Sequence, residues 1–258
     1  MCYEPTDRPP IAPMAGGSVE TEELELVAAD GNRLSAFAAR TGDRPSPHAV
    51  LILPDVRGLH PFYISLAERF AEAGVDALAI DYFGRTAGVG HRDDSFDYMQ
   101  HTVQATWAGL SADITAGARA LATPPGRPVY TVGFCFGGRA SFLSDGLAGI
   151  TGVVGFYGPP GPTTRYAVPA PIESVGGFHG PVLGLFGGAD QGIPADQVEA
   201  FDAALQAAGV PHELVTYPDA PHSFFDRKAT DYAAASADAW RRILAFVGAP
   251  GAAAESRA

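Results

Sequence analysis

One short segment of the chain carries a residue that could act as a nucleophile. Cys135 lies in the run GFCFGG, residues 133–138, which follows a buried-strand pattern and precedes a helical pattern. A sharp strand-to-helix turn needs small residues two places before and after the nucleophile, and Gly133 and Gly137 occupy those places. The helix dipole would favour the thiolate, and the amide N–H of Phe136 could stabilise an oxyanion. This spacing favours nucleophilic catalysis by Cys135.

Two other interpretations of the same segment are open at this point. A free cysteine in a tight turn is often simply a buried core residue. A glycine-rich loop after a strand can also bind a dinucleotide, but the spacing GxGxxG is absent here and no suitable acidic residue follows a second strand. The sequence therefore argues against a dinucleotide site, and the choice between catalysis and packing depends on partners for the thiol.

A cysteine nucleophile needs a base, and the base needs an orienting group. His222 lies in a loop after the last strand pattern, and Asp190 ends the run FGGAD directly after the preceding strand pattern. Taken singly, His222 could be an exposed loop residue and Asp190 a turn or helix-capping residue. Their order of nucleophile, acid and histidine, each after its own strand, matches the arrangement in α/β-hydrolases.

The elements that would position these residues alternate between strands and helices. Residues 23–27 and 34–38 alternate polar and apolar around the turn DGN, which predicts an antiparallel hairpin at the N-terminal edge. The rest predicts an α/β fold with a mostly parallel central sheet and helices on both faces, and Ser111 as a helix cap. Ligand chemistry would then lie at the carboxyl ends of the strands. The predicted strands are 48–54, 75–82, 129–134, 151–158, 181–187 and 212–218, and the predicted helices are 61–74, 111–122, 139–146, 194–209 and 232–248.

Composition limits the classes of partner. The chain has 258 residues, 47% of them hydrophobic, and a formal net charge of −12, so it can build a core but lacks the basic surface that nucleic acid or an anionic membrane requires. The early acidic residues and prolines do not form a signal peptide, which favours a cytoplasmic location. We expect an extended N-terminal segment at 1–18, one domain at 19–248 and a flexible tail at 249–258.

The remaining chemical groups suggest no cofactor. Cys2 and Cys135 are the only cysteines, which rules out a disulfide framework and predicts two thiols. His91 and His101 have no partner at metal-ligand spacing, so no metal site is expected. The long segment 159–180, rich in proline and glycine, could be a lid over the site or only a surface connection.

Together these motifs resemble the dienelactone hydrolase family of the α/β-hydrolase superfamily, and the resemblance covers most of the chain. It rests on the residues LPDVRGLHPFYISLAERFAEAGVDALAIDYFGR, GFCFGG, GFYG, GGAD and PHSFFDR. The resemblance implies Cys135 as nucleophile, His222 as base and Asp190 as orienting acid. It also implies an oxyanion hole formed by the backbone N–H groups of Phe136 and Val56.

The resemblance also suggests residues that would modulate the thiol and bind substrate. Asp55 stands where archetypal members carry a glutamate that holds the resting thiol, although a turn residue is an equally good description of it. Those members clamp a substrate carboxylate with two arginines. Arg85 and Arg92 lie in the corresponding connection of this chain, and Asp226 occupies the place of the second arginine, with Arg227 next to it. An acidic residue there should weaken anion binding.

The expected substrate pocket combines these polar groups with aromatic side chains, namely Tyr82, Phe134, Tyr157 and Phe224, which could equally be core residues. The implied function is cofactor-free hydrolysis of an activated ester or enol lactone through a Cys-His-Asp triad and an acyl-thioenzyme, by a monomer or homodimer. Two alternatives stay open: a biosynthetic cyclase, isomerase or acyl transferase that uses the same site, and a binding protein without catalysis.

Overall fold

The computed structural model describes residues 8–13, 18–42, 46–90, 92–163, 165 and 167–249, and these form one eight-stranded mixed sheet in the order β1-β2-β4-β3-β5-β6-β7-β8. Strand β2 runs antiparallel to both of its neighbours, and every pairing from β4 to β8 is parallel. The α/β fold predicted from the sequence is therefore confirmed, including the antiparallel N-terminal edge. The strands are β1 (Val19–Val27), β2 (Arg33–Thr41), β3 (Ala49–Leu53), β4 (Asp76–Ile80), β5 (Val129–Phe134), β6 (Gly152–Phe156), β7 (Val182–Gly187) and β8 (His212–Tyr217).

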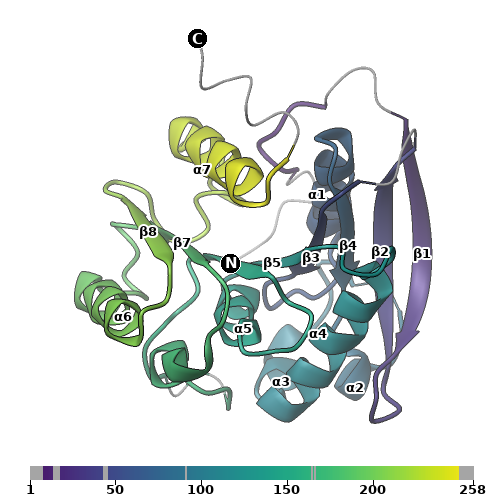
Figure 1. Ribbon diagram of the computed structural model, residues 1–258, viewed down its shortest axis with the longest axis horizontal. Coiled ribbons are helices and arrows are strands. Elements are labelled where there is room, and N and C mark those ends of the chain that lie inside the picture. The colour runs from purple at the N-terminus through teal and green to yellow at the C-terminus, as the bar shows by residue number, and fades with distance from the viewer. Residues whose placement is uncertain are drawn as a thin grey trace.

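Helices cover both faces of the sheet (Figure 1). On one face, α1 and α7 lie together, and the Phe70 ring of α1 contacts Trp240 of α7 at 4.7 Å between centroids. On the other face, α5 lies beside α6, where the rings of Phe142 and Phe201 are 5.1 Å apart. The helices are α1 (Pro61–Glu72), α2 (Gly84–Ala87), α3 (Tyr98–Thr102), α4 (Trp107–Leu121), α5 (Phe136–Ser144), α6 (Ala195–Ala208) and α7 (Ala233–Phe246), with the 3-10 turns η1 (Pro171–Glu173) and η2 (Val175–Gly177).

The central strands are buried on both faces, which explains their unbroken apolar sequences. In β3, Val50 and Ile52 belong to the core cluster under α1, whereas Leu51 and Leu53 belong to the cluster that includes Ile114 of α4. Burial on both faces is the environment of a parallel sheet between two helical layers. Polar side chains can then reach solvent mainly where these strands end.

Two helix starts differ from the sequence prediction. Helix α4 begins four residues before Ser111, because Thr106 is its N-cap and accepts a hydrogen bond from the Gly109 amide at 3.2 Å. Ser111 instead lies inside the helix and donates to the Ala108 carbonyl. Helix α5 begins at Phe136 rather than at residue 139, so the glycines after Cys135 form its first turn.

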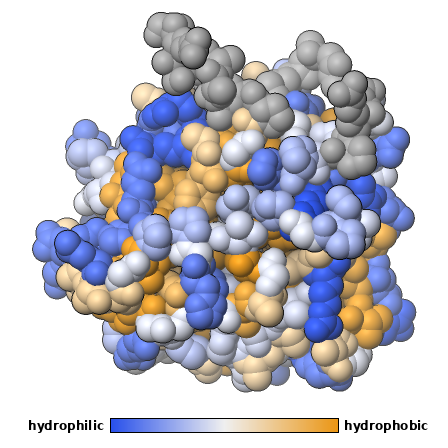
Figure 2. All heavy atoms as spheres, in the orientation of Figure 1, coloured by the Kyte–Doolittle hydropathy of each residue, from blue (hydrophilic) through white to orange (hydrophobic). Residues whose placement is uncertain are grey.

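Hydrophobic and hydrophilic residues are interleaved on the face of the molecule that Figure 2 shows. Within the described part of the chain, no helix is long and apolar enough to cross a membrane. Ile11, from the predicted N-terminal segment, packs against the larger core cluster. The predicted tail beyond residue 249 and Cys2 lie outside the described residues, and the domain limits stay a prediction.

Candidate active site

The turn that holds Cys135 has the strained geometry that the sequence predicts. Cys135 stands between β5 and α5 with φ 54° and ψ −110°, a conformation that residues with a side chain rarely adopt. Its amide donates to the Phe156 carbonyl of β6 at 3.0 Å, and its carbonyl accepts from the Arg139 amide in α5 at 3.0 Å. The turn is thus anchored to the neighbouring strand and to the helix.

Glycine is required on both sides of this turn. A Cβ atom on Gly133 would lie 2.0 Å from the Gly137 carbonyl oxygen, and one on Gly137 would lie 2.1 Å from the Leu53 carbonyl oxygen. The first contact joins β5 to α5 and the second joins α5 to the end of β3. Only glycine permits such backbone approaches, so these residues bring three elements together around Cys135.

Asp190 and His222 meet at the carboxyl ends of β7 and β8. Asp190 is 6% exposed, and its Oδ2 lies 2.6 Å from Nδ1 of His222. Its Oδ1 accepts a hydrogen bond from the Gly192 amide at 2.8 Å, which fixes the orientation of the carboxylate. With Nδ1 engaged by Asp190, the other ring nitrogen of His222 is the one available to a substrate or thiol.

The surroundings of His222 raise the pKa of its imidazole. Burial alone would lower the pKa of His222, but hydrogen bonds to Asp190 and Cys135, with the negative charges of those groups, raise the pKa to about 10. The imidazole also contacts the Tyr157 ring at 4.9 Å between centroids. Tyr157 and Ser223, like Cys135, have positive φ values, 35° and 64°. All three strained residues therefore lie around one site.

A cavity of about 470 Å³ opens onto Cys135 and His222. It is formed by the loops after β6, β7 and β8 together with Cys135 from the turn after β5. Two arginines and a lysine line it, although the chain as a whole is acidic. The lining residues are Cys135, Pro159, Arg165, Ala189, Asp190, Gln191, Gly192, Ile193, Pro221, His222, Ser223, Arg227 and Lys228.

The two amides expected to form an oxyanion hole belong to residues at the ends of α5 and β3. Phe136 is the first residue of α5, and Val56 follows β3, whose end touches α5 at Gly137. Within the described residues, the Val56 amide has no hydrogen-bond acceptor. An amide at the first turn of a helix and one at the end of a neighbouring strand are suitable donors to a developing negative charge.

A cluster of buried charges lies behind the cavity, and the sequence did not reveal it. The Arg57 guanidinium pairs with Asp55 at 2.6 Å and approaches Asp226 at 3.6 Å, and all three side chains are at most 7% exposed. Burial, followed by the negative charge of Asp226, raises the pKa of Asp55. Arg227 lies 4.0 Å from the Asp55 carboxylate and lines the cavity. The carboxylates of this cluster therefore face arginines from two loops.

This cluster changes the interpretation of Asp55 and Asp226. The described residues show no hydrogen bond between Asp55 and the Cys135 thiol, because the Asp55 carboxylate is held by Arg57 through Nε at 2.8 Å to each oxygen. Asp226 accepts a hydrogen bond from the Tyr157 hydroxyl at 3.2 Å and does not line the cavity. The spacing of Arg57, two residues after Asp55, was the signal in the sequence that could have suggested the first pair.

The structure does not bring Arg85 or Arg92 to Cys135. Arg85 pairs with Asp113 of α4 at 2.8 Å and with Asp30 at 2.5 Å, and Arg92 pairs with the buried Asp81 at 2.8 Å. Both arginines are therefore used to fix the connection after β4 against the sheet. Of the arginines that the sequence suggested for substrate binding, Arg227 alone lines the cavity with Cys135.

The aromatic residues proposed for the pocket lie mainly in the core. Phe134 and Phe224 are fully buried, and Phe134 stacks on Phe156 at 4.7 Å. Tyr82 is 3% exposed and donates to the carbonyl of Asp55 at 2.9 Å and to that of Pro54. None of these three lines the cavity. These large rings pack in the core behind the loops, where most of their surface is buried.

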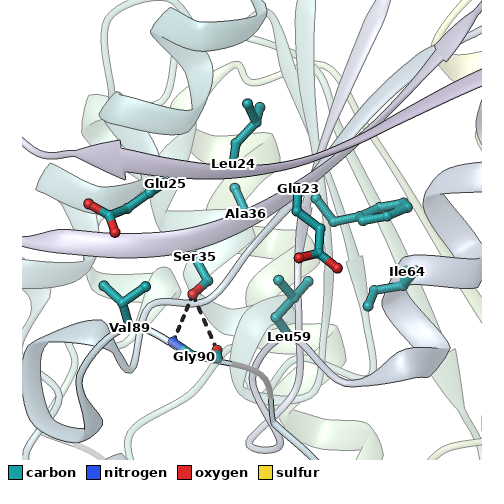
Figure 3. A pocket seen from close by; sticks show the side chains of 10 residues that line it. Glu23, Leu24, Glu25, Ser35, Ala36, Leu59, Ile64, Val89 and Gly90 are labelled. Carbon is teal, nitrogen blue, oxygen red and sulfur yellow. Dashed lines mark hydrogen bonds between the residues drawn. The ribbon is translucent and has the colours of Figure 1, made fainter.

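The described residues contain no group of three or more histidine, cysteine or acidic side chains arranged to hold a metal ion. His101 stacks on Phe96 at 5.0 Å, and His91 lies outside the described residues. A second cavity, of about 280 Å³, lies at the β1–β2 edge, where Ser35 bonds to the backbone of Gly90 and Glu23 and Glu25 extend from one side of β1 (Figure 3). It shares no residue with the Cys135 cavity.

Known proteins resemble this chain over most of its length. Residues 34–250 match the sequence profile of the "Dienelactone hydrolase family". An Escherichia coli K12 protein named "Putative carboxymethylenebutenolidase" is 29% identical over 251 residues, which is 92% of each chain. A Synechocystis protein of the same name is 30% identical over 204 residues, 75% of this chain and 82% of that one.

A solved structure agrees with these sequence matches. The crystal structure titled "Putative Dienelactone Hydrolase" from Klebsiella pneumoniae superposes with a TM-score of 0.78 at 27% identity, covering 90% of this chain and 99% of that one. The fold, the position of the Cys135, Asp190 and His222 motifs at strand ends, and the match to the family profile all agree. The chain belongs to the dienelactone hydrolase family.

Proposed function

We propose that this protein hydrolyses an activated ester or enol lactone with Cys135 as nucleophile, His222 as base and Asp190 as the residue that orients His222. One observation carries the proposal. Cys135 stands in a strained strand-to-helix turn and shares a cavity with His222, whose Nδ1 is 2.6 Å from a buried aspartate. Nucleophile, base and orienting acid in this relation are the parts that acyl transfer needs.

In the acylation half of the reaction, His222 holds the proton of the Cys135 thiol, and the sulfur attacks the substrate carbonyl carbon. The C–S bond forms as the carbonyl π electrons move to oxygen, where the amides of Phe136 and Val56 donate to the oxyanion. The oxyanion then collapses and the C–O bond to the leaving group breaks. His222 protonates the leaving oxygen, and an acyl-thioenzyme remains.

In the second half, His222 takes a proton from water, and the hydroxide formed attacks the thioester carbonyl. Collapse of this intermediate expels the Cys135 thiolate and releases the carboxylic acid. A thiolate is a better leaving group than an alkoxide, so attack by Cys135 on an alkyl ester would largely reverse. Esters whose leaving group is an enolate or phenolate are therefore the preferred substrates.

The test uses p-nitrophenyl acetate, with the Cys135→Ala variant compared with a Cys2→Ala variant that removes the other thiol. We expect a stoichiometric burst of p-nitrophenol in the wild type and in Cys2→Ala, and a loss of kcat/KM of about 10⁴-fold in Cys135→Ala. Mass spectrometry of the quenched burst should find the acetyl group on Cys135. Hydrolysis by Cys135→Ala at the wild-type rate would refute the proposal.

A labelled-water experiment separates hydrolysis from the other acyl-transfer reactions. In H₂¹⁸O, hydrolysis places one labelled oxygen in the released acid during a single turnover. A rearranged or cyclised product without label would indicate that the acyl-thioenzyme is intercepted by another nucleophile. Ligand binding without a burst and without turnover would indicate a binding protein.

A further inference from the structure

The cavity has one wall that carries none of the three catalytic candidates. The loop after β7 supplies Asp190, and the loop after β8 supplies His222. Of the described residues in the segment after β6, Pro159 and Arg165 line the cavity. A wall without a catalytic residue can change shape without changing the reaction. The position of such a wall can therefore determine which substrates fit the cavity.

The contacts of this segment lead to one buried side chain. Arg139, in the first turns of α5, is 1% exposed. Its Nη1 donates to the carbonyl oxygens of Pro159 at 2.8 Å and Gly161 at 2.7 Å, and its Nη2 donates to the carbonyl oxygen of Val168 at 3.0 Å. One guanidinium thus holds the segment at three places, before and after Arg165.

We propose that Arg139 is a positioning residue that holds the Pro159 wall of the cavity at a fixed distance from Cys135, and so determines the size of acyl group that the enzyme accepts. This inference rests on the proposed function, because it concerns the substrate of the same site. It assigns the choice of acyl group to a side chain that does not itself line the cavity.

The placement of Arg139 links the wall to the nucleophile directly. The Arg139 amide donates to the Cys135 carbonyl at 3.0 Å, so the same helical turn carries both the strained nucleophile and the clamp. The wall also begins in contact with α5, since a Cβ on Gly158 would lie 2.4 Å from the Gly138 carbonyl carbon. A displacement of the segment therefore changes the space beside the sulfur.

The chemistry of arginine suits this task better than that of lysine. A planar guanidinium presents several N–H groups in a fixed fork, which allows three carbonyl oxygens in different directions to be bound at once. A lysine at this position keeps the charge but concentrates its donors on one atom at the end of a flexible chain. Arg139→Lys should release part of the segment without removing charge from the interior.

The experiment measures kcat/KM of Arg139→Lys for p-nitrophenyl acetate and p-nitrophenyl hexanoate, which share a leaving group and differ in acyl length. We expect kcat/KM for the hexanoate to fall by about tenfold, mainly through KM, and that for the acetate to stay within about twofold. The matched control is Arg127→Lys, because the Arg127 side chain is only 6% exposed and also donates to two backbone carbonyls, at the opposite end of β5. Its hexanoate-to-acetate ratio should equal that of the wild type.

A second measurement follows the wall without using activity. Arg165 lies in an exposed position within the clamped segment, so trypsin cleavage after Arg165 reports its release. We expect this cleavage to be at least about fivefold faster in Arg139→Lys than in the wild type or in Arg127→Lys. If Arg139→Lys does not fold, Arg139→Gln serves in both assays, because its amide can still bond one or two of the carbonyls.

The outcomes distinguish the two proposals. An active wild type whose hexanoate-to-acetate ratio is unchanged in Arg139→Lys, or in which both substrates lose activity equally, overturns the role of Arg139. Unchanged cleavage after Arg165 also overturns it. A wild type without a burst on either ester refutes the proposed function instead, whatever the protease result.

Discussion

His222 illustrates how a few contacts determine the state of one residue. Its pKa is raised to about 10 because the hydrogen bonds and charges of Asp190 and Cys135 outweigh the effect of burial. A pKa of about 10 means that the imidazole is protonated at neutral pH. In the proposed acylation step, a leaving enolate or phenolate would take its proton from this imidazole.

This raised pKa makes the stability of the protein depend on pH in a definite direction. The folded state binds a proton on His222 that the unfolded state releases with a pKa near 6.5, so the contribution of His222 is complete below pH 6.5 and is lost as the pH rises toward 10. We expect the difference in unfolding free energy between the wild type and His222→Gln to shrink steadily over that interval, as measured by urea denaturation at several pH values. A difference that stays constant from pH 6.5 to 10 would contradict this assignment.

An NMR titration gives the direct control. In Asp190→Asn the hydrogen bond to Nδ1 remains possible but the negative charge is absent. The pKa of His222 should therefore be lower in Asp190→Asn than in the wild type, and kcat on p-nitrophenyl acetate should fall with it.

At the scale of elements, the site depends on how closely α5 approaches the sheet. Gly133 in β5, Gly137 in α5 and the end of β3 meet through backbone atoms alone. This approach places the start of α5, with the Phe136 amide, beside Cys135. The same turn of α5 carries Arg139, so strand, nucleophile and cavity wall depend on one packing arrangement.

The close approach can be tested at Gly133. A Cβ there would meet the Gly137 carbonyl oxygen at 2.0 Å, and neither backbone can yield without separating β5 from α5. Gly133→Ala should therefore lower the unfolding free energy by about 3 kcal/mol or more and reduce the burst amplitude. Gly176→Ala is the control, because nothing lies within 4 Å of its added Cβ, and its stability should change by less than about 0.5 kcal/mol. Equal stability of the two variants would show that the turn tolerates a side chain.

At the scale of the whole molecule, the sheet gathers groups that are far apart in the sequence. Parallel strands place the loops after β3, β5, β7 and β8 at one edge, which is where Asp55, Cys135, Asp190 and His222 lie. The cavity there carries Arg165, Arg227 and Lys228 within a chain of net charge −12. These three basic side chains are gathered at one site although the chain as a whole is acidic.

At the scale of the whole molecule, the limits of the folded domain can be tested. We propose that residues 19–248 fold as one cooperative unit, to which Ile11 adds a contact with the core. A chain shortened to 19–258 should unfold in a single transition at a Tm lower by about 2–4 °C, as expected for the loss of roughly 1 kcal/mol in a protein of this size. Calorimetry of the full and shortened chains measures this. Two separate transitions in the full chain would refute the single domain.

Sequence alone determined the fold class, and it predicted Cys135, Asp190 and His222 as the candidate site residues that the structure brings together. Apolar strand runs, helical spacing and glycines around Cys135 are local features. Asp190 and His222 were predicted because each lies in the loop after a strand pattern. The chain order of strands and helices then predicted a mostly parallel sheet, and parallel strands bring such residues to one edge whatever the details of packing.

Tertiary structure decided which charges and rings belong to the cavity. Arg85 pairs with Asp113, 28 residues away in the chain, whereas Arg227 lines the cavity beside Lys228. Asp55 is held by Arg57 rather than by the thiol, and the aromatic rings pack inside. Arg139 binds carbonyl oxygens 20 to 29 residues further along the chain. Such pairings depend on where loops meet in space, and no local sequence pattern encodes them. A long charged side chain at the end of a strand can reach any of several partners, and the packing of the loops decides which one it contacts.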